Sequence, residues 1–171
     1  IIAYNAESKA VESMRPNGVL LAQIAPNGGV ISGSSSVVQL DAWNWEDATV
    51  KYDQGIHINW PSPYTYGRWW LDEDRGLKVN NNYSSQVKGL KDFFEKSKAN
   101  MNVNKSMNIK SKAMKSIING ESTVYLYADD EKEIVDGVTF LKKFGIAKIV
   151  IVGASESRNQ LDFIKENNIC L

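Results

Sequence analysis

The chain has 171 residues, and its 20 Lys and Arg residues balance its 20 Asp and Glu residues. This length suits one domain with a substantial hydrophobic core. A formal net charge of zero gives no general reason to expect nucleic acid or an anionic membrane as a partner. No apolar run approaches the roughly 20 residues that span a bilayer. The first residues lack the basic start and apolar core of a signal peptide, and the single Cys170 allows no internal disulfide. Periplasmic and cytoplasmic locations therefore both stay open.

The first predicted elements are a helix over residues 4–14, stopped by Asn17-Gly18, and a strand over residues 19–25. Because the residues of this strand are mostly apolar rather than alternating, they predict a strand that is buried on both faces, as in a parallel sheet. Residues 30–40 predict a small strand pair or an extended loop.

The stretch 26–36 between these strands is rich in Gly and Ser. One interpretation is a loop at the carboxyl end of a barrel strand, where Gly28, Gly29 and Ser32 face a ligand. Amides and hydroxyls of such a loop hold an oxyanion or a phosphate. The other interpretation is a tight turn followed by an edge hairpin.

Residues 41–83 contain all five tryptophans and predict a long excursion with little regular structure. One interpretation of these aromatic residues is a platform on which sugars or bases stack. The alternative is a small satellite core or a subunit interface, where Trp and Tyr are enriched.

His57, the only histidine, falls within this excursion. A lone histidine can act as a general base, and it can equally hydrogen-bond across the aromatic residues around it. Most hydrolytic zinc sites use two or more histidines or several cysteines. We therefore expect no metal site formed by this chain alone.

The remaining residues predict alternating helices and strands. Helices are expected over residues 84–99, 109–118, 129–144 and 156–167, and strands over residues 123–128, 148–152 and 169–171. Strand–helix units of this length imply right-handed crossovers and a parallel sheet. The predicted fold class is therefore α/β.

Two strand ends in this region carry candidate site residues. Asp129 is a general base or metal ligand at the mouth of a barrel, or an acid that complements a helix dipole. Gly153 belongs to a turn that binds an anion on helix amides, or to an ordinary strand–helix turn in which Ser155 caps the helix.

We expect a single domain over residues 1–171, organised as a strand and Gly/Ser loop (1–40), an aromatic insertion (41–83), and helices with βα units (84–171). The chain opens inside a predicted helix and closes as a strand starts, which leaves a sheet edge bare. This pattern predicts a piece of a larger α/β protein that self-associates. The alternative is a domain whose edges are covered by a partner.

Specific residues carry a resemblance to a known family. Arg15–Gln23 and Pro26–Val38 resemble the amidohydrolase superfamily, in particular its imidazolonepropionase-like members. Asp41–Ala48 resembles one bacterial branch of that group, and residues 123–171 are similar to later βα units of the same barrel. The resemblance implies a partial (β/α)8 TIM-barrel-like sheet from a hydrolase acting on carbon–nitrogen bonds of small amides. Active relatives use zinc or another divalent metal, with a metal-bound hydroxide as nucleophile.

The departures from the family limit what it implies. The His-x-His metal pair of active relatives would precede Ile1, and their later ligands would follow Leu171. Where a relative's strand tends to end in a metal-binding histidine, this chain has Tyr127, whose phenol has a pKa of about 10 and is a poor zinc ligand. Relatives often carry an acid near the position of Lys112. No metal ligand carries over, so the resemblance implies either an inactive fragment or a non-catalytic barrel. Such a barrel would bind anions or proteins, a paralogous subunit among them.

Overall fold

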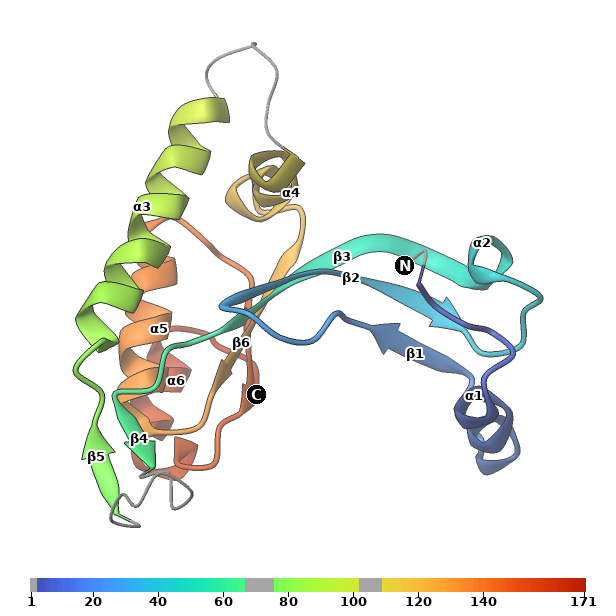
Figure 1. The fold of residues 1–171 in the computed structure, drawn as a ribbon, viewed down its shortest axis with the longest axis horizontal. Helices are drawn as coiled ribbons and strands as arrows, with labels where there is room; N and C mark the ends of the chain where they lie inside the picture. Colours follow the sequence, from blue (N-terminus) through green and yellow to red (C-terminus); the bar gives the residue numbers. More distant parts are fainter. Residues whose placement is uncertain (1–2, 67–75, 102–108) are drawn as a thin grey trace.

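The computed structural model describes residues 3–66, 76–101 and 109–171 and shows an α/β fold around a five-stranded sheet (Figure 1). Its strands run in the order β1-β2-β3-β6-β7. Their bounds are β1 Leu21–Ile24, β2 Ile31–Gln39, β3 Thr49–Asn59, β6 Thr123–Ala128 and β7 Ile149–Gly153. A separate hairpin pairs β4 (Tyr64–Tyr66) with β5 (Leu77–Val79).

The helices lie between and after these strands. Their bounds are α1 Lys9–Met14, α2 Trp45–Ala48, α3 Tyr83–Met101, α4 Ile109–Ile118, α5 Glu131–Lys143 and α6 Leu161–Glu166. Short 3-10 helices precede β1 at Arg15–Asn17 and α6 at Ser157–Gln160. No helix in the described part of the chain is long and apolar enough to cross a membrane.

The second half of the sheet is parallel and curls into half a barrel. Strand β3 pairs with β6, and β6 pairs with β7, both in parallel. Cys170 adds a single parallel bridge to Val150, where the sequence predicts a last strand. The connection from β6 through α5 to β7 is a predicted strand–helix unit. The connection from β3 through α3 and α4 to β6 is a second unit, whose first strand the sequence did not predict. The predicted fold class, a partial barrel of α/β type, is confirmed.

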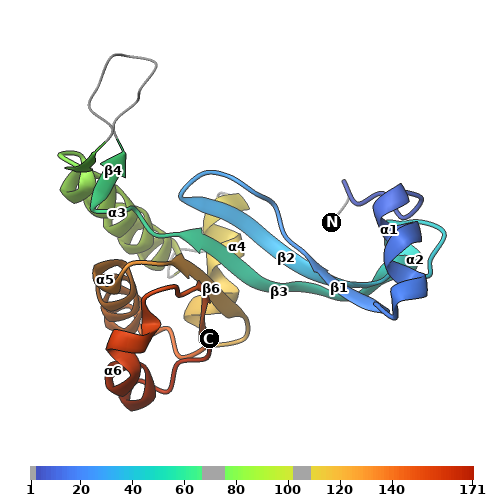
Figure 2. The same cartoon turned by 90° about the horizontal axis from the view of Figure 1, so that it is seen from below.

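One face of the parallel strands packs against α3, α4 and α5 and forms the main hydrophobic core. This core contains Ile56 and Ile58 from β3 and Leu126 from β6, each 3% exposed or less. The antiparallel strands β1, β2 and the first half of β3 extend away from these helices as an arm (Figures 1 and 2). The arm has its own small core, built on Val11, Val38, Leu40 and Ala48.

The prediction of a buried parallel strand over residues 19–25 is wrong. Strand β1 is an antiparallel edge strand, and Leu20 and Leu21 are 72% and 57% exposed. An apolar run indicates that a segment prefers to be buried. It does not indicate which strand pairs with the segment or in which direction. Residues 30–40, predicted as a strand pair or loop, form one long strand that pairs on both sides, with β1 and with β3.

The prediction that residues 41–83 have little regular structure is also wrong, because Thr49–Asn59 is the longest and central strand. The first half of β3 lies in the exposed arm and is polar, as at Lys51 and Asp53. The second half enters the core with Ile56 and Ile58. Since the environment changes halfway along the strand, no single periodicity marks it. Predicted helix 4–14 is shorter than expected and begins at Lys9, where Ser8 caps it.

Candidate functional site

The face of the parallel sheet opposite the helices carries the polar residues of β3 and β6. Successive residues of a strand point to opposite faces, so His57 and Asn59 lie opposite Ile56 and Ile58. Tyr127 extends from the same face of the neighbouring strand β6. The carboxyl ends of parallel strands meet at one edge of a barrel, where such folds place their ligand sites. We therefore take this face and edge as the candidate site.

His57 and Tyr127 form the centre of this site. The imidazole Nδ1 lies 3.0 Å from the Tyr127 hydroxyl, and the two groups share a hydrogen bond. The imidazole also stacks on the ring of Tyr125, with ring centroids 4.7 Å apart and planes 12° from parallel. Its other nitrogen, Nε2, is buried and has no hydrogen-bond partner in the described part of the chain. The ring is thus fixed on two sides and retains one unused polar atom.

Burial sets the charge state of His57. The side chain is only 4% exposed, and loss of solvation lowers its pKa from the ordinary value of 6.5. The imidazole is therefore neutral at pH 7. A neutral ring that shares one nitrogen with a phenol can accept a proton or donate a hydrogen bond at the other nitrogen.

Asn59 attaches the Gly/Ser turn to the end of β3. Its amide Nδ2 donates to the Gly29 carbonyl at 2.6 Å and to the Ser32 hydroxyl at 3.0 Å. Gly28 and Gly29 form the turn with φ of +97° and +73°, values that favour glycine. The structure therefore brings Gly29 and Ser32 beside the end of a barrel strand.

One interpretation of the sequence placed this turn after a barrel strand. In the structure it follows β1, which is antiparallel to its neighbour. The serine hydroxyls that follow the turn bond to side chains of neighbouring strands and do not point into an open anion-binding loop. Ser34 donates to the Asp53 carboxylate at 2.7 Å, and Ser35 accepts from the Gln23 amide at 2.8 Å. The other interpretation is right about the turn but not about an edge hairpin after it, because residues 31–39 form one strand that pairs with both β1 and β3.

Asp129 and Gly153 meet at the ends of β6 and β7. The Ser155 hydroxyl and backbone amide donate to Asp129 Oδ1 at 2.7 and 3.3 Å. Gly153 has a φ of +94°, and a Cβ there would lie 2.6 Å from the same oxygen. The amide of the predicted anion-binding turn thus already binds a carboxylate of this chain.

The acids beside Asp129 act as helix caps. Asp130 is the N-cap of α5, and Glu133 completes a capping box with the Asp130 backbone amide. This agrees with the helix-start interpretation of the acidic cluster. The prediction that Ser155 caps the following helix is wrong, because its hydroxyl is held by Asp129 and the next turn is a 3-10 helix starting at Ser157.

The sequence-predicted site residues form two groups. His57, Tyr127, Gly29 and Ser32 lie around the end of β3, and Asp129 lies with Gly153 at the next strand ends. Sequence reasoning missed Asn59 and Tyr125, and it gave Ser155 the role of a helix cap instead of a partner of Asp129. The alternation of His57 with Ile56 and Ile58 was the signal that places Asn59 on the same face as His57.

The donor atoms do not suit a metal ion. Across residues 3–66, 76–101 and 109–171, no three His, Cys, Asp or Glu side chains gather closely enough to hold one. His57 has a phenol at one nitrogen instead of a second imidazole or a carboxylate. A single neutral imidazole is far from the three or four ligands of a zinc site.

The three tryptophans that the structure describes do not form a stacking platform. Trp43 is 89% exposed beside α2 in the arm, and Trp60 is 6% exposed in the main core. The indole Nε1 of Trp60 donates to the Tyr83 hydroxyl at 3.1 Å. Trp69 and Trp70 lie outside the described residues.

Comparison with known proteins supports the fold. No protein-family model matches the sequence, and no curated protein matches it. Among solved structures, the crystal structure of an amidohydrolase from Thermotoga maritima MSB8 is similar, with a TM-score of 0.80 and 17% sequence identity. The chain has an amidohydrolase-like fold.

The alignment with this amidohydrolase structure covers 97% of the present chain but 45% of the Thermotoga chain. The present chain therefore spans less than half the length of the amidohydrolase structure. It corresponds to half of a barrel, in agreement with the curled three-strand parallel sheet.

Proposed function

We propose that this chain is a fragment of an amidohydrolase-like protein that hydrolyses carbon–nitrogen bonds of small, non-peptide amides. The chain alone is inactive, because it supplies a substrate-facing wall without the metal ligands. The observation that carries the proposal is the His57–Tyr127 pair, a buried imidazole bonded to a 36% exposed phenol, on the face of a half-barrel opposite its helices. This half-barrel is similar in fold to an amidohydrolase structure.

In such enzymes a bound metal would generate a hydroxide nucleophile and would polarise the carbonyl. His57 and Tyr127 contribute hydrogen bonds and shape on the wall opposite that chemistry. Neutral His57 holds the Tyr127 hydroxyl in place, and Asn59 fixes the adjacent turn through the Gly29 carbonyl and Ser32. Because burial lowers the pKa of His57, its imidazole is uncharged, and these roles do not require a charged side chain.

The proposal is tested by metal analysis and an amidase assay on the purified chain, without an affinity tag. We expect far less than one equivalent of zinc or other transition metal per chain and no hydrolysis of cyclic or linear amides when zinc is added. One equivalent of bound zinc that is lost in His57→Ala, together with amide hydrolysis, would show a complete site and contradict the proposal.

A second candidate function is a non-catalytic barrel that binds a protein partner, either a second copy of itself or a paralogous subunit. The exposed indole of Trp43 and the edge strands β1 and β7 favour it. Light scattering over a concentration series tests the self-association. A monomer at the highest concentrations contradicts a homo-oligomer, and a concentration-dependent dimer that Trp43→Ser weakens supports an interface at the arm.

A further inference from the structure

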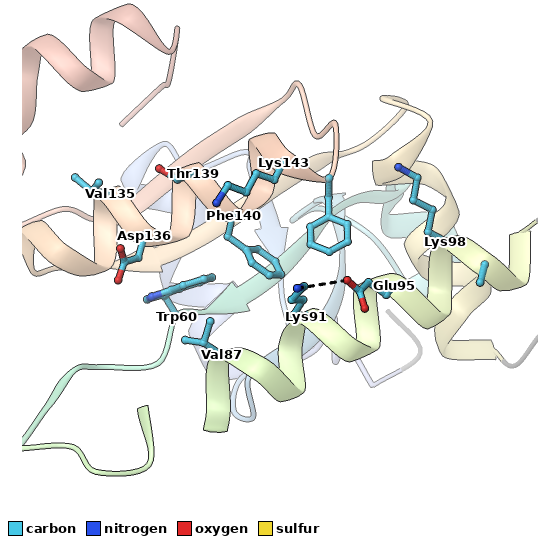
Figure 3. A pocket seen from close by; sticks show the side chains of 12 residues that line it. Trp60, Val87, Lys91, Glu95, Lys98, Val135, Asp136, Thr139, Phe140 and Lys143 are labelled. Atoms are coloured by element: carbon cyan, nitrogen blue, oxygen red, sulfur yellow. Dashed lines mark ion pairs between the residues drawn. The ribbon is translucent and has the colours of Figure 1, made fainter. Parts of the chain in front are cut away.

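A groove lies on the helical side of the protein, away from the candidate site. It runs between α3 and α5 and has a volume of about 920 Å³. Small-molecule sites commonly occupy ~300–1,000 Å³. Figure 3 shows Trp60 and Phe140 between the two helices, with Lys91 and Glu95 along α3. The groove has the size of a ligand site, although it lies outside the barrel wall where the proposed hydrolysis belongs.

The floor of the groove is aromatic and rigid. Trp60 packs on Phe140 with ring centroids 5.4 Å apart, and Phe140 packs on Phe144 at 4.9 Å. Phe94 supports both phenylalanines from beneath, at 5.2 and 5.1 Å. The indole is further fixed by its hydrogen bond to Tyr83. A floor held by these contacts presents a fixed apolar surface, which favours an apolar body of a ligand.

The charges along the groove are distributed unequally. Asp136, midway along α5, pairs with the Lys132 ammonium at 2.8 Å and accepts a hydrogen bond from the Tyr83 hydroxyl at 2.6 Å. Glu95, midway along α3, pairs with Lys91 at 3.7 Å. Lys98, near the end of α3, and Lys143, whose ammonium points away from Lys98 towards Phe140 (Figure 3), make no ion pair with any residue that the structure describes. The acids of the groove are therefore paired, whereas two of its positive side chains are not.

Helix dipoles explain part of this charge. Lys98 and Lys143 lie in the last turns of α3 and α5, where a positive side chain offsets the negative end of the helix. The dipole effect gives no reason for an aromatic groove of this volume to be lined by both lysines. An amphiphile with one anionic end complements both features at once.

We propose that the groove between α3 and α5 binds one free molecule of an anionic amphiphile. Its apolar body would lie over Trp60, Phe140 and Phe144, and its carboxylate would lie at the Lys98 end, with Lys143 adding positive charge along the groove. Between Val87 and Lys98 the helix rises by roughly 16 Å, a length that suits a medium straight-chain acid. The finite length of the groove favours a free molecule over a membrane lipid.

Isothermal titration with octanoate, below its micelle concentration, tests the proposal on the full chain. We expect saturable binding of one octanoate per chain, and weaker binding of 1-octanol, which has the same chain without the charge. Equal binding of the two ligands, or no saturable binding of octanoate, overturns the proposal. Binding only to vesicles of phosphatidylglycerol, with none to free octanoate, also overturns it.

Variants locate the binding in the groove. The double variant Lys98→Glu/Lys143→Glu should weaken octanoate binding by about tenfold or more. Lys165→Glu reverses the charge of an exposed residue on α6. It is the matched control and should leave the affinity for octanoate unchanged. Thr139→Trp fills the groove and should abolish binding. Circular dichroism confirms folding of each variant, and unchanged affinity in the folded double variant contradicts the assignment.

Discussion

Nδ1 of His57 and the hydroxyl of Tyr127 lie 3.0 Å apart although 70 residues separate them in sequence. The parallel register explains this contact. His57 pairs directly with Tyr125, and Tyr127 follows two residues later on the same face of β6. The two parallel strands therefore place a phenol over the only histidine of the chain.

Removal of this phenol tests how much the pair contributes to the fold. Tyr127→Phe keeps the ring and leaves Nδ1 of the buried imidazole without its partner. We expect the free energy of unfolding to fall by about 1–2 kcal/mol, since a buried polar atom loses its hydrogen bond. Urea unfolding measures the change. Tyr66→Phe, on an 80% exposed tyrosine, is the control and should change little; equal losses in both variants would mean that the pair does not stabilise the fold.

Replacement of Tyr127 by histidine tests whether the missing second imidazole is what keeps this site from binding zinc. In Tyr127→His, the new ring replaces a phenol that approaches His57 to hydrogen-bond distance, so two imidazoles share one face. Zinc-bound nitrogens lie about 2.0–2.1 Å from the metal. Two imidazoles on neighbouring strands can reach one zinc ion at this distance. We expect zinc affinity to rise about tenfold or more over wild type, as measured by competition with a chelating dye. The double variant His57→Ala/Tyr127→His should lose the gain, and its persistence would place the zinc elsewhere.

The pH dependence of stability follows from the burial of His57. Its pKa in the folded state is lowered below 6.5, so the unfolded chain binds more protons between the two pKa values. The stability contributed by the neutral imidazole is complete above pH 6.5 and is lost as the pH falls towards the folded pKa. Since the chain has one histidine, its imidazole signals in NMR titrate without overlap. His57→Gln should flatten this part of the stability profile, and an unchanged profile would contradict the assignment.

The sequence predicts the parallel half of the fold better than the arm. Helix α5 is predictable because Asp130 and Glu133 cap it and because Ile134, Val138 and Leu141 repeat at helical spacing. Strand β3 escapes prediction because half of it lies in the arm and half in the core. Each half alone is too short or too polar to show its period.

The candidate site is predictable residue by residue but not as an arrangement. His57 is singled out as the only histidine, and Tyr127 by the family resemblance. Their contact depends on the pairing of β3 with β6, which local sequence does not encode. Asn59 draws no attention in the sequence, because its role appears only when the Gly29 turn folds back beside it.

Glycine at position 153 is required by two separate effects, which matched variants separate. Gly145 has a φ of +84° with open space around it, so Gly145→Ala should cost only the backbone strain, about 1 kcal/mol. Gly153 has a φ of +94°, and its new Cβ would also meet Asp129 Oδ1 at 2.6 Å. We expect Gly153→Ala to cost about 3 kcal/mol. Thermal and urea unfolding measure both, and equal costs would show that the carboxylate moves away freely.

Tyr83 connects the aromatic core to a surface ion pair. Its hydroxyl accepts from the Trp60 indole at 3.1 Å and donates to the Asp136 carboxylate at 2.6 Å. Tyr83→Phe removes both bonds and leaves a buried indole N–H unpaired. We expect a loss of about 1–3 kcal/mol in the free energy of unfolding. Trp60→Phe in the same background removes the unpaired group and should recover part of the loss.

The ionisation of Tyr83 gives an independent measurement of the same contacts. Burial, together with the hydrogen bond to Asp136, raises the pKa of the Tyr83 phenol from 10.0 to about 12. The unfolded chain therefore loses this proton first as the pH rises above 10, and the folded state loses stability from there towards pH 12. Ultraviolet titration of wild type minus Tyr83→Phe should show one phenol that ionises later than the exposed tyrosines. A difference spectrum with its midpoint at the ordinary value would mean that the hydroxyl faces water and that Trp60 has another partner.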